Sequence, residues 1–423
     1  MKKIISFALF LCLSVCSFLS ICSENVFAAE SISKKQWIED INYMAKEFVK
    51  THPKLEDEKT KDEFYNQINE LIESVPNIDD EKINIGMRKI IAYLEDSHTD
   101  VHEAFENVFP IHVEWLKDGF YVKLTLEEYN QALYCKVAKI DGIEIKEISK
   151  LLETIIPHEN SVVIKKRVQK YITSPELLYG LDIIDDKEVI TFTFENQEGK
   201  QFDMDIEAID IKSIKEMKFV GNQNKNIPLY MQNIKENYWF KYLSDSKAIY
   251  LKYNRCFAMK DKSIEEFIKE VFDVVDSNQV DKFIIDLRDN PGGKEGTMHP
   301  LFKEIIDRDH INKFHKLYVI VGQYTASSAA INSIQLQEYT NAIFVGEPTF
   351  TKPDHYGAIS EFVLPNSKLE VTCSTKYAEL SKIFKCVSED DKSFMPDVIV
   401  ENSIEDLING RDAVLDSILR NQE

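Results

Sequence analysis

Residues 317–331 read LYVIVGQYTASSAAI, an apolar run that stops at a glycine and continues into small residues and serines. The five apolar residues before Gly322 predict a short buried strand, and the small residues after Tyr324 predict a helix from Ser327 to Gln337. Ser327 would then begin the helix, where free backbone N–H groups and the helix dipole stabilise negative charge. A serine in that place is either a nucleophile or an ordinary helix cap.

The stretch upstream is also an apolar run followed by a loop that contains glycine. An apolar strand over Phe283–Leu287 runs into DLRDNPGG at residues 286–293. Pro-Gly-Gly leaves backbone N–H groups uncovered by side chains, and such groups can hold an oxyanion. The alternative interpretation is a tight turn between a strand and a helix.

The stretch downstream places a lysine after a third strand. Ala342–Val345 is apolar, and GEPTFTKP follows at residues 346–353. A lysine acts as a general base when burial keeps its amine neutral, and Lys352 lies in a proline-bounded loop rather than on a charged helix face. A solvated surface charge is the alternative.

These stretches belong to a longer alternation of strands and helices. An alternation of this kind predicts an α/β domain with a central sheet, and such sheets carry their sites in the loops that follow the strands. The predicted strands are 248–253, 283–287, 317–321 and 342–345, and the predicted helices are 263–275, 299–306 and 327–337.

Together the three loops resemble those of the C-terminal processing (tail-specific) serine peptidases. The motifs of that family read Asp-Leu-Arg-x-Asn-x-Gly-Gly, Ser-Ala-Ser-Ala-Ser-Glu and Gly-Glu-x-Thr-Phe-Gly-Lys. The second aligns with residues 325–330, so the family's nucleophile falls on Ser327, and Lys352 follows Ser327 by the family's spacing of 25 residues.

The resemblance implies an endopeptidase that works through an acyl-enzyme and needs neither a cofactor nor a metal. Ser327 would be the nucleophile and Lys352 its general base. Gly292 or Gly293, together with the N–H of Ser328, would form the oxyanion hole. The substrate would be a protein or peptide.

Two residues depart from the family pattern. Ala330 stands where many relatives have a glutamate, and Thr351 stands where they have a glycine before the lysine. Beyond Lys352 the chain reads KPDHYG, close to the Lys-Pro-Asn-His-Tyr-Gly of a bacterial secreted branch.

The resemblance covers most of the chain and implies its organisation. The fold class would be α/β, with a ClpP/crotonase-like catalytic domain at 237–423, a helical N-terminal cap domain at 29–107, a PDZ-like α+β domain at 108–210 and a linker at 211–236. Local patterns agree with this division. Apolar residues recur at helical spacing before Asp96. Beyond it, strands are expected at 109–113, 120–124, 136–140 and 189–194, with a helix at 145–155.

The histidines offer other chemistry. His98 and His102 are four residues apart, a spacing that would share a helix face, but the third ligand that a metal site requires has no counterpart at a suitable spacing. His98 is interpreted as structural or as part of a substrate cleft. His355 could line the same cleft, or serve Ser327 in a Ser–His–Asp triad, an interpretation ranked below the lysine dyad.

Charge and the N-terminus limit the partners and the compartment. A formal net charge of −21 without a basic stripe argues against nucleic-acid binding. Lys2, Lys3, an apolar run to Ile21 and small residues up to Ala28 predict a signal peptide over 1–28 and export from the cytoplasm. An uncleaved membrane anchor and a lipoprotein at Cys22 are the alternatives.

Two further questions stay open at this stage. Cys135, Cys256, Cys373 and Cys386 are too few for a disulfide framework, and free thiols are favoured over a Cys373–Cys386 pair. A catalytically inactive protein that binds peptides or apolar ligands on the same fold is the runner-up function.

Overall fold

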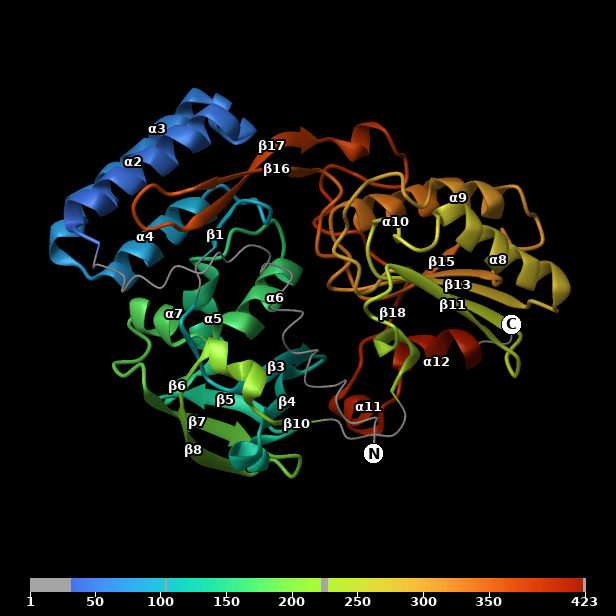
Figure 1. Cartoon of the computed structure of the whole chain (residues 1–423), viewed down its shortest axis with the longest axis horizontal. Coiled ribbons are helices and arrows are strands. Elements are labelled where there is room, and N and C mark those ends of the chain that lie inside the picture. Colours follow the sequence, from blue (N-terminus) through green and yellow to red (C-terminus); the bar gives the residue numbers. More distant parts are fainter. Residues whose placement is uncertain (1–31, 103–104, 222–226, 421–423) are drawn as a thin grey trace. The chain divides into compact units, whose positions relative to one another are not determined.

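The computed structural model describes residues 32–102, 105–221 and 227–420, and the predicted signal peptide lies outside them. These residues form two compact units, whose elements are labelled in Figure 1. The first unit comprises 32–157, 167–221 and 358–375, and the second comprises 158–166, 227–357 and 376–420. All three loops singled out from the sequence lie in the second unit.

The first unit begins with three helices, α2 (Lys34–Thr51), α3 (Glu58–Ser74) and α4 (Asp80–Ala92). Each starts at a side chain that accepts a hydrogen bond from the helix's free N–H groups, namely Ser33, Asp57 and Asp79. Their apolar faces form one core, as the helical spacing predicts. Its buried members include Ile41, Phe48, Phe64, Ile68, Met87 and Ile91.

An antiparallel sheet forms another part of this unit. Its main strands run in the order β10-β4-β5-β7-β8, with β3 paired to β4 and β6 to β5. The strand bounds are β3 (Ile111–Leu116), β4 (Gly119–Leu126), β5 (Lys136–Ile140), β6 (Ile143–Glu144), β7 (Val189–Glu195), β8 (Gln201–Glu207) and β10 (Phe219–Gly221). Helices α5 (Ile145–Glu153), α6 (Ser161–Tyr171) and α7 (Pro175–Gly180) lie between β6 and β7 in the chain, and β2 (Asn107–Val108) pairs with β9 (Ile209–Asp210).

A small second sheet joins distant parts of the chain. Its order is β1-β17-β16, with bounds β1 (Asp100–His102), β17 (Glu370–Ala378) and β16 (His355–Val363). Val101 lies opposite Val371 in the antiparallel pairing of β1 with β17. Leu364, Val371 and Cys373 are buried in the helical core, so a segment far along the chain completes it.

The second unit is built on a sheet in the order β11-β12-β13-β14-β15-β18. The bounds are β11 (Tyr238–Leu243), β12 (Ala248–Tyr253), β13 (Lys282–Asp286), β14 (Leu317–Val321), β15 (Ile343–Gly346) and β18 (Val398–Ile399). Only β11 is antiparallel to its neighbour; the pairings from β12 to β18 are parallel. Asp286 lies opposite Ile320, and Val321 opposite Gly346, so β13, β14 and β15 end side by side.

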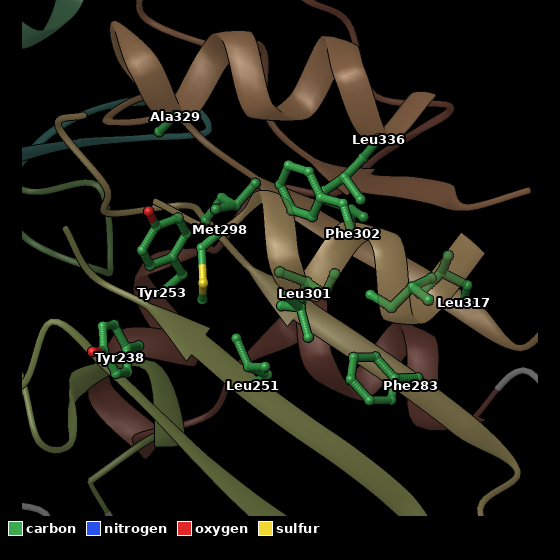
Figure 2. Packing of buried hydrophobic residues seen from close by; sticks show 14 of the residues in the cluster. Tyr238, Leu251, Tyr253, Phe283, Met298, Leu301, Phe302, Leu317, Ala329 and Leu336 are labelled. Atoms are coloured by element: carbon green, nitrogen blue, oxygen red, sulfur yellow. The ribbon is translucent and has the colours of Figure 1, made fainter. Parts of the chain in front are cut away.

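Helices cover both faces of this sheet (Figure 1). On one face lie α8 (Ile264–Ser277), α9 (His299–Ile306) and α10 (Ser328–Tyr339), and on the other lies α12 (Ala413–Arg420). Figure 2 shows the first of these cores, where Leu251 and Phe283 of the sheet meet Leu301 and Phe302 of α9. The remaining helix, α11 (Ile404–Asn409), precedes α12. Burial on both faces accounts for the continuous apolar strands in the sequence.

The mixed α/β fold is therefore confirmed. The helical segment and the antiparallel sheet, predicted as separate domains with boundaries at 107 and 210, both lie in the first unit. Within the predicted linker 211–236, β10 pairs with β4. These domain boundaries and the PDZ-like character of the sheet stay predictions. Among the described helices, none combines the length and apolarity needed to cross a bilayer.

Candidate active site

Three loops leave the carboxyl ends of β13, β14 and β15 at one edge of the parallel sheet. Two backbone hydrogen bonds join the β14 loop to its neighbours: Ala326 N donates to Asn290 O at 3.0 Å, and Phe350 N donates to Thr325 O at 3.0 Å. The parallel register therefore brings together the three sequence stretches that resemble the peptidase motifs.

Ser327 has a strained backbone at the junction of its loop with α10. Its φ is +49° and its ψ is −127°, a conformation that costs a residue with a Cβ about 1–3 kcal/mol. It is the N-cap residue of α10, yet its side chain makes no capping hydrogen bond. The hydroxyl is half-buried and is not used to satisfy the helix terminus, so a serine is not needed here for capping.

Gly292 lies directly against this serine. Its φ is +96°, and a Cβ at this position would come within 2.8 Å of the Cβ of Ser327 and 3.0 Å of the N of Ser328. Only glycine fits at this contact, because a side chain would push the two loops apart. The Pro-Gly-Gly turn is thus packed on the serine at the start of the helix.

Asn290 shapes the glycine loop and decides which of its donors remain open. The Asn290 side chain is fully buried, donates to Tyr253 O at 2.9 Å and accepts the Gly292 N–H at 2.9 Å. Since Gly292 N is thereby bonded, the N–H groups of Gly293 and Ser328 are the candidates to face a developing oxyanion. Neither N–H has a hydrogen-bond acceptor within the described part of the chain.

Lys352 lies in the loop after β15, two residues beyond Phe350. Its side chain is half-buried. In the parts of the chain that the structure describes, neither Lys352 Nζ nor Ser327 Oγ makes a hydrogen bond, so the two are not bonded to each other. Catalytic hydrogen bonds are often long without substrate and shorten in the enzyme–substrate complex.

A buried asparagine supports the lysine loop. Asn160 Nδ2 donates to Phe350 O at 2.9 Å and to Lys392 O at 2.8 Å, and its Oδ1 accepts from the N–H groups of Val162 and Val163 at the start of α6. The loop that carries Lys352 is therefore held from a segment almost 200 residues earlier. Asn160 has no recognisable signal in the sequence, because it is far along the chain from the loop that it supports.

The two candidate histidines lie in different units. His355 is buried in the second unit, and its Nδ1 lies 2.9 Å from Pro353 O. In a Ser–His–Asp triad, Nδ1 is the ring nitrogen that contacts the carboxylate. His98 is in the first unit, where its backbone N donates to Asp96 Oδ1 at 3.0 Å. Instead of sharing a helix face with His98, His102 lies in β1 and contacts Thr372 Oγ1 at 3.1 Å.

Asp96, at the helix end before His98, is the centre of a buried polar cluster. Its carboxylate lies 3.1 Å from His52 Nε2 and accepts from Thr99 Oγ1 at 2.5 Å. Burial acts to raise the Asp96 pKa, but these partners and the charge of His98 outweigh it, and the pKa is lowered. The cluster fixes the turn that carries His98.

A second buried cluster anchors the glycine loop at the end of β13. Asp286 accepts from Tyr250 OH at 2.5 Å, from Lys252 Nζ at 3.2 Å and from Arg288 Nε at 3.0 Å. Arg288 in turn makes a bidentate pair with Asp412, at 2.7 and 2.9 Å. Lys252 and Asp412 had no recognisable signal in the sequence, because each is far from the motif along the chain.

We expect the stability of the fold to fall in acid because of the Asp286 carboxyl group in this cluster. Burial acts to raise the Asp286 pKa, but Arg288 and Lys252 outweigh it and hold the pKa at about 2. A carboxyl group whose pKa is depressed in the folded state stabilises the fold above its ordinary value of about 3.9, and this contribution is lost as pH falls through about 2. We expect about 2 kcal/mol of stability to disappear between roughly pH 4 and pH 2 from this group.

Urea unfolding of wild type and Asp286→Asn checks this expectation. The variant should lose about 3–5 kcal/mol at pH 7, since the buried cations lose their partner, and should show a smaller further loss on acidification. Asp273→Asn is the matched control, because its pair with Lys269 is exposed and worth about 0–1 kcal/mol. An Asp286→Asn variant as stable as that control would contradict the prediction.

The four cysteines of the described chain, Cys135, Cys256, Cys373 and Cys386, are free thiols. Burial raises the pKa of Cys256 to about 11, so the thiol beside the glycine loop is protonated at neutral pH and is a poor nucleophile.

The fold and these loops define the class of protein. It is an α/β protein with a strained serine at the end of a parallel sheet; the serine lies beside a glycine turn, and its side chain does not cap the helix that follows.

No sequence family and no curated protein matches the chain. Among solved structures, mature CPAF in complex with lactacystin is similar, with a TM-score of 0.64 and 11% identity over 92% of this chain and 98% of that one. The photosystem II D1 C-terminal processing protease also matches, with a TM-score of 0.41 and 12% identity over 93% of this chain and 97% of that one.

The likeness to CPAF concerns the fold, since the identity is low. It extends over nearly the whole of both chains, so both units have counterparts in CPAF. The α/β fold expected from the sequence therefore has a counterpart among solved structures.

Proposed function

We propose that this protein is an extracytoplasmic serine endopeptidase with Ser327 as nucleophile and Lys352 as general base. The observation that carries the proposal is Ser327 itself, a serine that bears backbone strain, makes no helix cap and has Gly292 packed against it. Strain of this kind persists where the surrounding structure enforces it, and it is concentrated at functional sites. Nucleophilic serines of other hydrolases stand on comparable turns between a strand and a helix.

The proposed reaction passes through an acyl-enzyme. Neutral Lys352 takes the proton of Ser327 Oγ as the oxygen attacks the scissile carbonyl carbon. The N–H groups of Gly293 and Ser328 stabilise the oxyanion of the tetrahedral intermediate. Its collapse breaks the C–N bond, and the leaving amine takes the proton back from the lysine. Water, deprotonated by the same lysine, then attacks the ester carbonyl carbon, the bond to Ser327 Oγ breaks, and the lysine returns its proton to that oxygen.

The departures from the family pattern leave the proposed dyad intact. Ala330 is buried in α10, so any carboxylate that assists Lys352 comes from elsewhere in the chain. Proteins and peptides are the proposed substrates. The strong negative charge of the chain argues against nucleic-acid partners.

The alternative is a binding protein on the same fold without catalytic activity. Incubation of the purified protein with an unfolded protein substrate, beside Ser327→Ala prepared in the same way, separates the two. Fragments that form with wild type and not with the variant support the peptidase. Binding of the substrate without cleavage by either protein supports the alternative.

Export is the part of the proposal that rests on the N-terminal sequence. We expect the mature protein to begin near Ala29 and to be found outside the cytoplasm, because the charged start, apolar run and small residues before Ala29 have the pattern of a cleaved signal. N-terminal sequencing of protein from the native cell tests this. A start at Met1 or a lipid-modified Cys22 would replace the cleaved signal with an anchor or a lipoprotein.

A further inference from the structure

Thr351, the residue that departs from the family pattern before the lysine, contacts the proposed nucleophile. Its side chain is fully buried, and its Oγ1 accepts the backbone N–H of Ser327 at 2.9 Å. The two residues lie on different loops, after β15 and β14. A glycine at position 351 would have no atom to make this bond.

The bond acts on the strained part of the backbone. The Ser327 N–H belongs to the peptide plane that leads into the residue with φ +49°, so an acceptor fixed in space holds the orientation of that plane. Ala326, on the other side of the same plane, is bonded through its own N–H to Asn290 O at 3.0 Å. The serine is thereby held from the glycine loop and from the lysine loop.

Thr351 is itself held rigidly. Its carbonyl accepts from Thr349 Oγ1 at 2.9 Å, and Thr349 Oγ1 accepts from Phe394 N at 3.0 Å. The preceding residue, Phe350, donates to Thr325 O and accepts from Asn160. An acceptor with so little freedom can impose a geometry on the N–H that it binds.

We propose that Thr351 is a positioning residue that keeps Ser327 in its strained conformation, with the hydroxyl directed for attack. The inference rests on Ser327 being the nucleophile and does not depend on which group is the base. It assigns to a side chain of this protein a function that the glycine of the resembling peptidases cannot perform.

The test compares Thr351→Val, which keeps the shape and loses the acceptor, with Thr351→Ser, which keeps the hydroxyl. Both are assayed for hydrolysis of an unfolded protein or a peptide. We expect kcat of Thr351→Val to fall roughly 10- to 100-fold with KM changed less than about threefold, since a small misplacement of the reacting group lowers the rate and not the binding. Thr351→Ser should recover kcat to within about threefold of wild type, because it keeps the hydroxyl. If the packing of the threonine methyl group mattered instead, Thr351→Ser would be slow as well.

Two controls separate positioning from general damage. Thr193→Val removes a hydroxyl hydrogen bond to Asp203 in the sheet of the first unit, and it should leave kcat unchanged. The pH at which activity rises should be the same in Thr351→Val as in wild type, because threonine does not ionise in the pH range of the assay. Should Thr351→Val fail to fold, Thr351→Gly removes the acceptor without an apolar replacement and should show the same loss of kcat.

Each outcome decides the inference. A folded Thr351→Val or Thr351→Gly with the kcat of wild type overturns it, as does a Thr351→Ser that is as slow as Thr351→Val. Wild type that hydrolyses nothing overturns the proposed function and the inference together. Active wild type with an equally active Thr351→Val overturns the inference alone.

Discussion

Ser327→Ala should abolish hydrolysis, with a loss of roughly 10⁶-fold in kcat, as seen when the nucleophile of a serine peptidase is removed. Its thermal midpoint should stay close to that of wild type. The hydroxyl makes no hydrogen bond within the described structure, and alanine carries the same Cβ into the same strained backbone, so neither contacts nor strain change. Activity and unfolding temperature are measured on the same preparations.

A serine that served only as a helix cap would behave in the opposite way. The alanine variant would then keep its activity and lose about 1 kcal/mol of stability. Ser333→Ala is the control in the same helix: it loses a hydroxyl bond to Ala329 O at 3.0 Å and should keep its activity. Covalent labelling by a fluorophosphonate, mapped to Ser327 in wild type and absent from Ser327→Ala, would confirm the nucleophile directly.

Lys352→Ala and Lys352→Arg should be equally inactive. Arginine preserves the positive charge but does not deprotonate in proteins, whereas the proposed base acts only as the neutral amine. In wild type, kcat/KM should therefore rise with pH along a single limb as the base loses its proton, and the profile reports that ionisation in the free enzyme. The measurement is kcat/KM against pH for wild type, with both variants assayed beside it.

A histidine variant completes this experiment, since His355 is the other candidate base. His355→Ala should retain the rising limb if the lysine is the base. An active Lys352→Ala enzyme, together with a limb near pH 6.5 and loss of activity in His355→Ala, would instead assign the base to His355. The pH dependence of wild-type kcat/KM and the activities of the variants are independent observations. A structural effect of one substitution would change the activity of that variant and leave the wild-type pH profile as it is.

Much of the second unit could be predicted because its signals are local. The strands before Asp286, Gly322 and Gly346 are short apolar runs that end at turn residues, and they were placed within about one residue of their bounds. The order of elements along the chain then requires a parallel sheet with the three loops at one edge. The loops that carry Ser327, Gly292 and Lys352 are joined by hydrogen bonds for that reason.

Other elements carried no such signal. The strand β16 has neither a continuous apolar run nor a strict alternation, because Ala358 to Glu361 are all exposed, and it was not predicted. Its partner β17 completes the helical core through Val371, far along the chain from α2 to α4. A contact of this kind joins segments that are far apart in the sequence, so the local residue pattern does not predict it.

The strands, the turns and the spacing along the chain predict where the candidate site lies, because they bring the loops with one serine, one glycine pair and one lysine to the same edge. How these residues are held depends on tertiary contacts. Asn290 takes the N–H of Gly292 and leaves that of Gly293, Arg288 reaches Asp412, and the hydroxyl of Thr351 binds the amide of Ser327. The physical reason is that strand and turn preferences act between neighbours in the chain, whereas a hydrogen bond depends on distances of about 3 Å between loops that only folding brings together.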